Sequence, residues 1–504
     1  MRPRRADLVV PSVRASQDSG AEFRDDDARK NEGLLEKTSL DGLEQDSLRR
    51  EIWDLALPTL LTLIVEPLMT LVDTILIARI LSWDAVAALS GVGVASVCFK
   101  FAFALFNFLA VSLIPLTAEA TNERDKQQVV LAAVQLAVIC GTLVGAVLFG
   151  FAPQIVNWFA GTADLSSASM RQYAIDYIRY RAFGAPFVLF GYVASAACRG
   201  MQDTRSPLLA SIASNVTNLG LDVLLMTTFG MGVAGASLAT GISQGVLAAV
   251  LLATLLKARV LPGSWRSYLT IVDARRFAAV AESGVLSVRT FSILFTQTLA
   301  GLFATRLGSA AMAAYSVARQ VWLFQSIALD ALAITATSLV SRELGLEKQK
   351  LARQRAKVVS DAVLRWAVLI GAALGAATFI GAEQIARMFI STSSDAMATA
   401  EALQNVIPLL RVAAVLQPLA ALVFVLDGIF ASFTTEYNYV SASVLVAGMI
   451  ASGTIVAGVV WLKRGLMGVW LGFNVLMLGR ASALGLRYAF GWKQMVRKHH
   501  EAKS

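Results

Sequence analysis

Two acidic residues lie inside long apolar stretches of this chain. Asp73 lies in ALPTLLTLIVEPLMTLVDTILIARIL, fifteen residues after Pro58, and Asp222 lies in LASIASNVTNLGLDVLLMTTFG. An ionised carboxylate at membrane depth is destabilising by several kcal/mol even on lenient scales, so such residues are rare and usually functional. Two of them on different apolar segments suggest a protein that carries a cation through its interior.

Each acid has polar neighbours at helical spacing. Glu66 precedes Asp73 by seven residues, and Asn215, Asn218 and Asp222 follow an i, i+3, i+7 pattern, so each set falls on one helix face. Amide and carboxylate oxygens are suitable ligands for Na⁺. Two adjacent buried carboxylates also favour retention of a shared proton. The pattern therefore fits either ion, and the alternative is a structural set of hydrogen bonds between helices.

The second half of the chain offers candidates for a substrate cavity. Arg289 lies in the middle of an apolar segment, and its guanidinium could hold an organic carboxylate in bidentate geometry. The alternative is an ion pair that offsets burial, with Asp330 or Asp427 as the partner. We expect Gln320 and Trp322 to line the cavity near this arginine.

The composition is typical of a polytopic membrane protein. The chain has 504 residues, only 16% of them charged, and its mean hydropathy is +0.62. A helix crosses the hydrocarbon layer with about 20 apolar residues. We therefore expect an all-α protein that lies in the lipid bilayer. Twelve segments qualify: 52–80, 85–118, 127–152, 172–199, 206–229, 232–257, 277–304, 309–341, 358–381, 402–430, 438–461 and 466–490.

The placement of basic residues predicts the orientation. The net charge is +9, and Lys and Arg gather in alternate loops, around 124–126, 199–205, 257–276 and 342–357. The positive-inside rule then puts both termini on the cytoplasmic or stromal side. Binding to nucleic acid is not indicated, because the basic residues form no face of a soluble domain.

The N-terminal residues 1–48 are expected to form a disordered tail. Residues 1–16 contain four arginines and one acid, a composition typical of a plastid or mitochondrial transit peptide. A disordered cytosolic tail is the alternative. The plastid envelope is the suspected location, with the plasma membrane and the vacuole left open.

The sequence repeats itself. AVAALS at 85–90 matches AMAAYS at 311–316, an offset of 226 residues, and Pro186 matches Pro418 at an offset of 232. We expect two parallel six-helix lobes, 49–260 and 277–492, as in many secondary transporters. Residues 261–276 would form the linker between them, and 493–504 a polar C-terminal tail.

Enzyme chemistry and cofactors are not indicated. Cys98, Cys140 and Cys198 lie in apolar segments as small hydrophobic residues, and His499 and His500 lie in the expected polar tail. The sequence has no HExxH motif and no GxxxxGKS phosphate loop. Two membrane-embedded aspartates also occur in intramembrane proteases, but here their contexts are LVDTI and LGLDV rather than YD and GxGD.

Several longer motifs together resemble the multidrug and toxic compound extrusion (MATE) family, in its DinF-like branch and closest to plant and algal members. They are EPLMTLVDTILIARIL, CRGMQDTRSPL, SNVTNLGLDVLL, GMGVAGASLATGISQ, MAAYSVARQVWLFQSIALDALA and FVLDGIF. The resemblance covers about residues 50–490. It implies a monomer whose two lobes enclose a V-shaped central cavity.

The resemblance also implies a cation site in the first lobe, with Pro58 and Asp73 from its first helix, Asn218 and Asp222 from its fifth and Thr240 from its sixth. In the family, a bend at this proline accompanies protonation of the acid. The implied function is an antiporter that exports small organic compounds, either organic anions or amphipathic aromatics, in exchange for H⁺ or Na⁺. A flippase for lipids or lipid-linked precursors is the alternative.

Overall fold

The computed structural model describes residues 22–80, 85–120, 122–160, 168–262, 280, 282–307, 309–346, 349–390 and 396–502. All regular elements among them are helices, as lipid requires of a chain that must satisfy its backbone polar groups internally. Eleven helical stretches are long and apolar enough to cross a membrane, and a bent pair can make a twelfth. The expected all-α polytopic architecture is confirmed.

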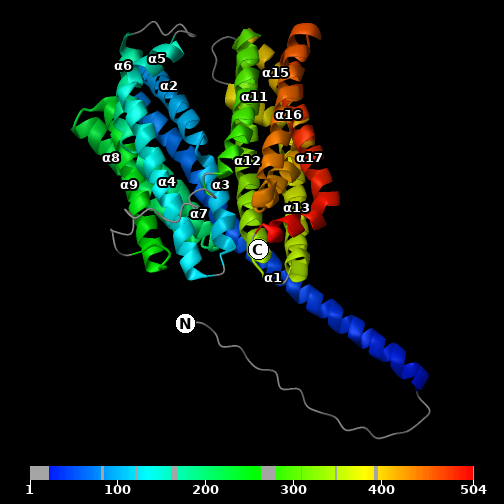
Figure 1. The fold of residues 1–504 in the computed structure, drawn as a ribbon. Coiled ribbons are helices and arrows are strands. Elements are labelled where there is room, and N and C mark those ends of the chain that lie inside the picture. Colours follow the sequence, from blue (N-terminus) through cyan, green and yellow to red (C-terminus); the bar gives the residue numbers. More distant parts are fainter. Residues whose placement is uncertain are drawn as a thin grey trace. The chain divides into compact units, whose positions relative to one another are not determined.

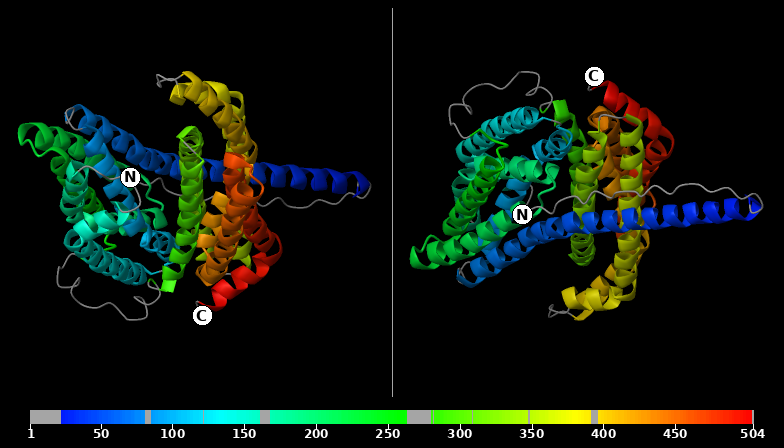
Figure 2. Two further views of the ribbon diagram at one scale, coloured as in Figure 1. Left: turned by 90° about the horizontal axis from the view of Figure 1, so that it is seen from above. Right: turned by 90° about the horizontal axis from the view of Figure 1, so that it is seen from below.

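The first lobe is built by nine helices, which are α1 (Glu22–Ile80), α2 (Ala85–Ala104), α3 (Asn107–Ala118), α4 (Glu123–Gly150), α5 (Ala152–Ala160), α6 (Ala168–Ala182), α7 (Ala185–Gly200), α8 (Arg205–Val223) and α9 (Gly232–Lys257). The second lobe contains α11 (Leu286–Arg306), α12 (Ser309–Leu344), α13 (Gln349–Ile380), α14 (Ala382–Ile390), α15 (Ala396–Ala431), α16 (Tyr437–Val456) and α17 (Gly465–Glu501). These two groups are distinct in Figure 1 and Figure 2 except at α1, which also reaches the second group, where Trp53 packs edge-to-face on Trp366 of α13.

Compact packing begins at Ile52, and the chain divides there into Met1–Glu51 and Ile52–Ser504. Helix α1 already begins at Glu22, so residues 22–48 are helical where we expected disorder. The segment EFRDDDARKNEGLLEKTSLDGLEQ is rich in residues with good helix propensity. The expected transit peptide and most of the expected linker lie outside the described residues.

The fourth span of the first lobe is the bent one. Helices α6 and α7 meet at an angle of 54°. Pro186, at the second position of α7, has no N–H to donate to the carbonyl of Ala182, so the helix ladder breaks there. Gly184 at the break lies against Gly241 of α9. A Cβ added to Gly184 would lie 2.9 Å from the Cα of Gly241.

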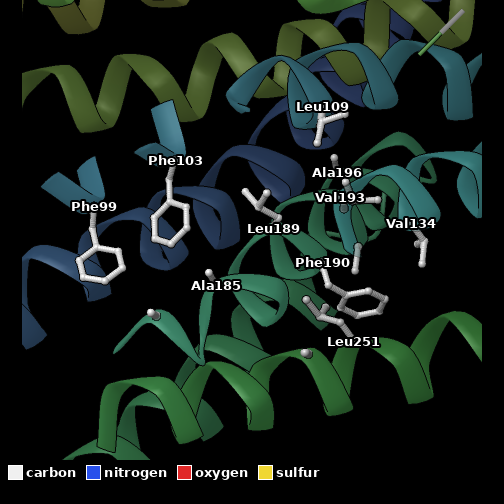
Figure 3. Packing of buried hydrophobic residues seen from close by; sticks show 14 of the residues in the cluster. Phe99, Phe103, Leu109, Val134, Ala185, Leu189, Phe190, Val193, Ala196 and Leu251 are labelled. Carbon is white, nitrogen blue, oxygen red and sulfur yellow. The ribbon is translucent and has the colours of Figure 1, made fainter. Parts of the chain in front are cut away.

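Interlocking small and large apolar side chains fill the first lobe. Figure 3 shows Phe99 and Phe103 of α2 and Leu189, Val193 and Ala196 of α7 within this cluster. Alanines at the contacts let helices approach closely, which is the usual basis of helix association in lipid. This packing joins α2, α4, α7 and α9 into one unit. Helix α8, which carries the polar residues, packs against α9.

The two lobes share the same close glycine contacts and the same turn geometry. A Cβ at Gly141 of α4 would lie 2.6 Å from the Cα of Pro186, and one at Gly371 of α13 would lie 3.0 Å from the Cα of Pro418. The α8–α9 and α16–α17 connections each contain a glycine at positive φ, with 54° at Gly232 and 55° at Gly465. The repeat seen in the sequence is therefore a repeat of packing and turn geometry.

Several contacts between the lobes lie at the end of the molecule that carries the loops 122–126 and 199–205, and another joins the Ser287 hydroxyl to the Leu105 carbonyl at 2.8 Å. The Ser338 hydroxyl donates to the Arg199 carbonyl at 2.6 Å, and Arg342 donates to the Gln202 amide oxygen at 3.1 Å. His499 Nε2 lies 3.1 Å from Glu119 Oε1, which joins α17 to the end of α3.

The C-terminal residues differ from expectation. Helix α17 runs to Glu501, so 493–501 continue the second lobe instead of forming a polar tail. Met495, Val496 and His499 are buried at helical spacing, and the imidazole packs edge-to-face against Phe433. We overlooked this one-sided pattern because basic residues surround it.

Candidate functional site

The two acids of the first lobe lie together. The carboxyl of Asp73, on α1, is within hydrogen-bonding reach of the carboxyl of Asp222, on α8. Asp222 is fully buried, and neither of its oxygens accepts a hydrogen bond from a donor in the described part of the chain. Two ionised carboxylates cannot hydrogen-bond to each other, because both only accept. Their contact therefore requires a shared proton or a bridging cation.

Among the described residues, a basic side chain that the sequence did not predict acts on Asp73. Arg181, near the end of α6, is the basic side chain whose charge reaches Asp73. Its guanidinium donates to the Tyr177 hydroxyl at 2.8 Å and lies 5.0 Å from the centre of the Phe99 ring. The two arginines in YIRYRAF, directly before the apolar stretch of α7, were the signal that could have identified it.

Asn218 lies on α8, the helix of Asp222, and Thr240 lies on α9, which packs against α8. Asn218 precedes Asp222 by one turn, is 4% exposed, and its amide nitrogen has no acceptor among the described residues. The Thr240 hydroxyl donates to the Ala236 carbonyl at 2.9 Å, which leaves its oxygen lone pairs for another partner. The α8–α9 contact is fixed by a 2.7 Å hydrogen bond from Ser214 to the Ser243 carbonyl.

The described residues contain no group of three or more His, Cys, Asp or Glu side chains that could hold a metal ion. A Na⁺ ion at the acid pair would therefore need amide and hydroxyl oxygens as further ligands, which Asn218 and Thr240 could supply. A proton would need only the two carboxyl groups.

Pro58 and Glu66 lie on the same helix as Asp73. Helix α1 continues through Pro58, whose carbonyl accepts a hydrogen bond of 2.8 Å from Thr62. Nothing is described of the Glu66 side chain, so its expected part in the cation site stays a prediction. The bend at Pro58 likewise stays a prediction.

The charged residues of the second lobe form a cluster. Arg289 of α11 donates to Asp427 of α15 at 3.0 Å, and Arg480 of α17 also donates to Asp427. Arg480 and Asp427 are nearly fully buried, whereas a fifth of the Arg289 side chain is exposed. Asp330 of α12 lies within electrostatic reach of both arginines and of Asp427. Arg289 thus forms the ion pair that was the alternative to substrate binding.

A small cavity lies in the second lobe, between α12, α15 and α17. It is lined by Arg319, Trp322, Ala413, Leu416, Gln417, Ala420, Trp470, Phe473, Asn474 and Met477. Trp322 is one of its lining residues, but Arg289, Gln320, Asp330 and Asp427 are not. A substrate cavity near Arg289, lined by Gln320 and Trp322, therefore stays a prediction.

Comparisons with known proteins agree with this architecture. The MatE family model matches residues 58–224 and 286–452, one match in each lobe. Protein DETOXIFICATION 44, chloroplastic, of Arabidopsis thaliana is 31% identical over 469 residues, covering 88% of this chain and 84% of its own length. Protein DETOXIFICATION 45, chloroplastic, of the same plant is 29% identical over 472 residues, covering 89% and 78%.

Solved structures show the same fold. A MOP superfamily transporter from Pyrococcus furiosus superposes with a TM-score of 0.75 at 21% identity, covering 91% of this chain and 97% of its own. A MATE transporter crystallised in a bent conformation gives 0.76 at 20% identity, covering 90% and 97%. At this level of identity the likeness establishes the fold alone.

The Asp427–Arg480 pair should be essential for folding. We expect Asp427→Ala to destabilise the protein by roughly 3–5 kcal/mol, because it leaves a buried guanidinium without its counter-charge. Thermal unfolding of the purified protein in detergent would measure this as a large drop in the melting temperature.

Glu383→Ala is the matched control, because Glu383 pairs with Arg387 on the exposed surface of α14. An exposed ion pair contributes about 0–1 kcal/mol, so the melting temperature should hardly change. The double variant Asp427→Leu with Arg480→Met should recover most of the loss. Equal melting temperatures for Asp427→Ala and Glu383→Ala would contradict a structural role for the cluster.

Proposed function

Because the chain belongs to the MatE family of membrane transporters, we propose that it is an antiporter that exports small organic compounds in exchange for one cation per cycle. The observation that carries this proposal is the contact of two carboxyl groups, from Asp73 and Asp222, inside the first lobe. A multi-pass transporter needs no such pair for folding, since apolar residues would satisfy the same helix contact without desolvating charge.

Charge counting supports a single coupling cation. With Asp73 and Asp222 ionised and Arg181 charged, the site would carry one net negative charge. One H⁺ or one Na⁺ neutralises it. Burial of a net charge in a low-dielectric interior is unfavourable, so the loaded and empty sites differ in which protein conformation they stabilise. That difference is what coupling requires.

The contacts between the lobes support alternating access. They lie at the end with the basic loops, which the positive-inside rule assigns to the cytoplasmic or stromal side. In this conformation that end is the closed one. Transport would require the Ser338, Arg342 and His499 contacts to separate, as the lobes rock about the substrate cavity.

The plastid envelope is the membrane we propose. Two relatives carry the word chloroplastic in their names, and residues 1–16 have the composition of a transit peptide.

Replacement of the acids should abolish coupling. In proteoliposomes we expect uptake of an organic substrate to be driven by an imposed H⁺ or Na⁺ gradient, and Asp73→Asn and Asp222→Asn to lose this drive. Measuring the flux under each gradient separately identifies the ion. Glu383→Gln, at an exposed acid, should behave like the unaltered protein. Gradient-driven flux that survives in both Asp variants would refute the site.

A crosslink between the lobes should stop transport. A Cβ added at Gly345 would lie 3.2 Å from the Cα of Glu119, so cysteines at these positions are close enough for a disulfide. The oxidised Gly345→Cys/Glu119→Cys protein should lose flux and regain it on reduction, while Gly345→Cys alone should not respond. Full flux through the crosslinked protein would show that this end does not open.

The targeting proposal is tested by fusing residues 1–60 to a fluorescent protein in plant cells. Import should carry the fluorescence into plastids, whereas fluorescence that stays in the cytosol would argue against the envelope. A second fusion with Arg2, Arg4, Arg5 and Arg14 replaced by Gln should lose import, because transit peptides depend on basic residues.

A further inference from the structure

Helix α17 is longer than the lipid layer is thick. Its 37 residues make a helix about 55 Å long, whereas the hydrocarbon is about 30 Å thick, so roughly a third of the helix can lie at or beyond the edge. Tyr488 indicates where that edge lies. Its hydroxyl donates to Asp361 of α13 at 2.7 Å, and Lys357 Nζ lies 3.5 Å from the centre of its ring. A tyrosine among charged side chains is typical of the interface between hydrocarbon and headgroups.

One face of this helix end changes from apolar to basic along its length. Leu486, Phe490, Lys493 and Arg497 follow i, i+4, i+7, i+11 spacing, so they share that face. Leu486 is 59% exposed and Phe490 86% exposed, and both basic side chains are exposed as well. The apolar pair lies next to the level of Tyr488, and the basic pair follows further out. A lipid molecule has the same order of apolar chain and polar headgroup.

Lys493 differs from other basic residues near it, which have carboxylate partners. Arg487 donates to Glu436 at 2.8 and 3.1 Å, and Lys357 Nζ lies 3.2 Å from Asp361 Oδ1. Lys493 has no carboxylate partner in the described part of the chain. Its charge is therefore available to an anion from outside the protein.

Arg497 has only an exposed partner. Its Nε lies 3.4 Å from Glu501 Oε1, and both side chains are about two thirds exposed. Ion pairs of this kind add little to stability, so an incoming phosphate competes with the carboxylate at little cost. A guanidinium suits phosphate because it can donate two parallel hydrogen bonds. Lys493 and Arg497 are one turn apart on one face, so a single phosphate can contact both.

We propose that this stripe binds an anionic phospholipid. The phosphate lies between Lys493 and Arg497, and an acyl chain packs along Leu486 and Phe490. The opposite face of the same helix end is buried, and there His499 lies 3.1 Å from Glu119 of the first lobe. The lipid therefore anchors at the membrane surface the segment through which α17 contacts the first lobe. This site is independent of the transported compound and of the coupling ion.

Two other anions fit the stripe less well. A free phosphate ester would contact Lys493 and Arg497 but would leave the exposed Phe490 without an apolar partner. An acidic peptide would reach the basic pair, but it would not reach Leu486, which lies on the hydrocarbon side of Tyr488 where charged groups are unfavourable. A phospholipid contacts all four residues.

The test measures lipid binding to the full-length protein in detergent by native mass spectrometry. Phosphatidylglycerol should bind at least about tenfold more tightly than phosphatidylcholine, whose headgroup carries no net charge. Lys493→Gln/Arg497→Gln should weaken binding of phosphatidylglycerol by about tenfold to thirtyfold and leave that of phosphatidylcholine unchanged. Phe490→Ser should weaken binding of both lipids, because it removes apolar contact with the acyl chain.

The matched control is Lys463→Gln/Arg464→Gln, which removes two positive charges from the exposed turn before the other end of α17. It should bind phosphatidylglycerol like the unaltered protein. All the replaced side chains are exposed, so the melting temperatures measured without lipid should agree among the variants. The comparison of the two lipids on the unaltered protein needs no variant at all.

Equal affinity for the two lipids, or equal losses of affinity in the two double variants, would overturn the proposal. Displacement of phosphatidylglycerol by glycerol 3-phosphate at similar concentration would indicate a site for free phosphate esters. Displacement by polyglutamate at similar concentration would indicate a site for an acidic peptide. Either displacement would overturn the assignment to a lipid.

Discussion

Every ionisable group inside a membrane-embedded bundle must find its counter-charge within the protein, and this constraint organises the molecule. In the second lobe, Asp427 lies between Arg289 and Arg480, and Asp330 is within electrostatic reach of both arginines. In the first lobe, the carboxyl groups of Asp73 and Asp222 lie together, and among the described residues Arg181 is the base whose charge reaches Asp73. An imbalance of charge that packing cannot remove is a site for a mobile ion. The lobe with the deficit is therefore the one expected to bind and release the cation.

The two lobes share a backbone plan and differ in chemistry. Glycines at matching positions let α4 and α13 approach the proline-containing helices opposite them, and matching turns follow α8 and α16. This common plan gives each lobe a rigid body. The buried charges differ between the lobes, with Asp73 and Asp222 on α1 and α8 in the first and a cluster of two arginines around Asp427 in the second. A duplicated scaffold thus carries two different arrangements of charge.

The sequence predicted which helices form better than it predicted which residues contact one another. Helix number and the acids at membrane depth follow from hydropathy, and the family resemblance pointed to Asp73, Asn218 and Asp222 together. Arg480 was missed because its partner Asp427 is 53 residues away, and helical periodicity says nothing about which faces of distant helices meet. The sequence left open whether Arg289 binds a substrate or forms an ion pair, because only the structure shows that Asp427 lies against its guanidinium. The burial of His499 was hidden by the charges around it.

The place of the proposed cation site restricts how transport can be coupled. A cation held by Asp73 and Asp222 lies between α1 and α8 within one lobe, whereas other residues make the contacts that join the two lobes. Coupling must then pass through conformation, with each ligand favouring one arrangement of the lobes by differential affinity. The contacts at Ser338, Arg342 and His499 join the lobes in one arrangement and must break in the other. A ligand that favours one arrangement therefore favours either keeping or breaking these contacts.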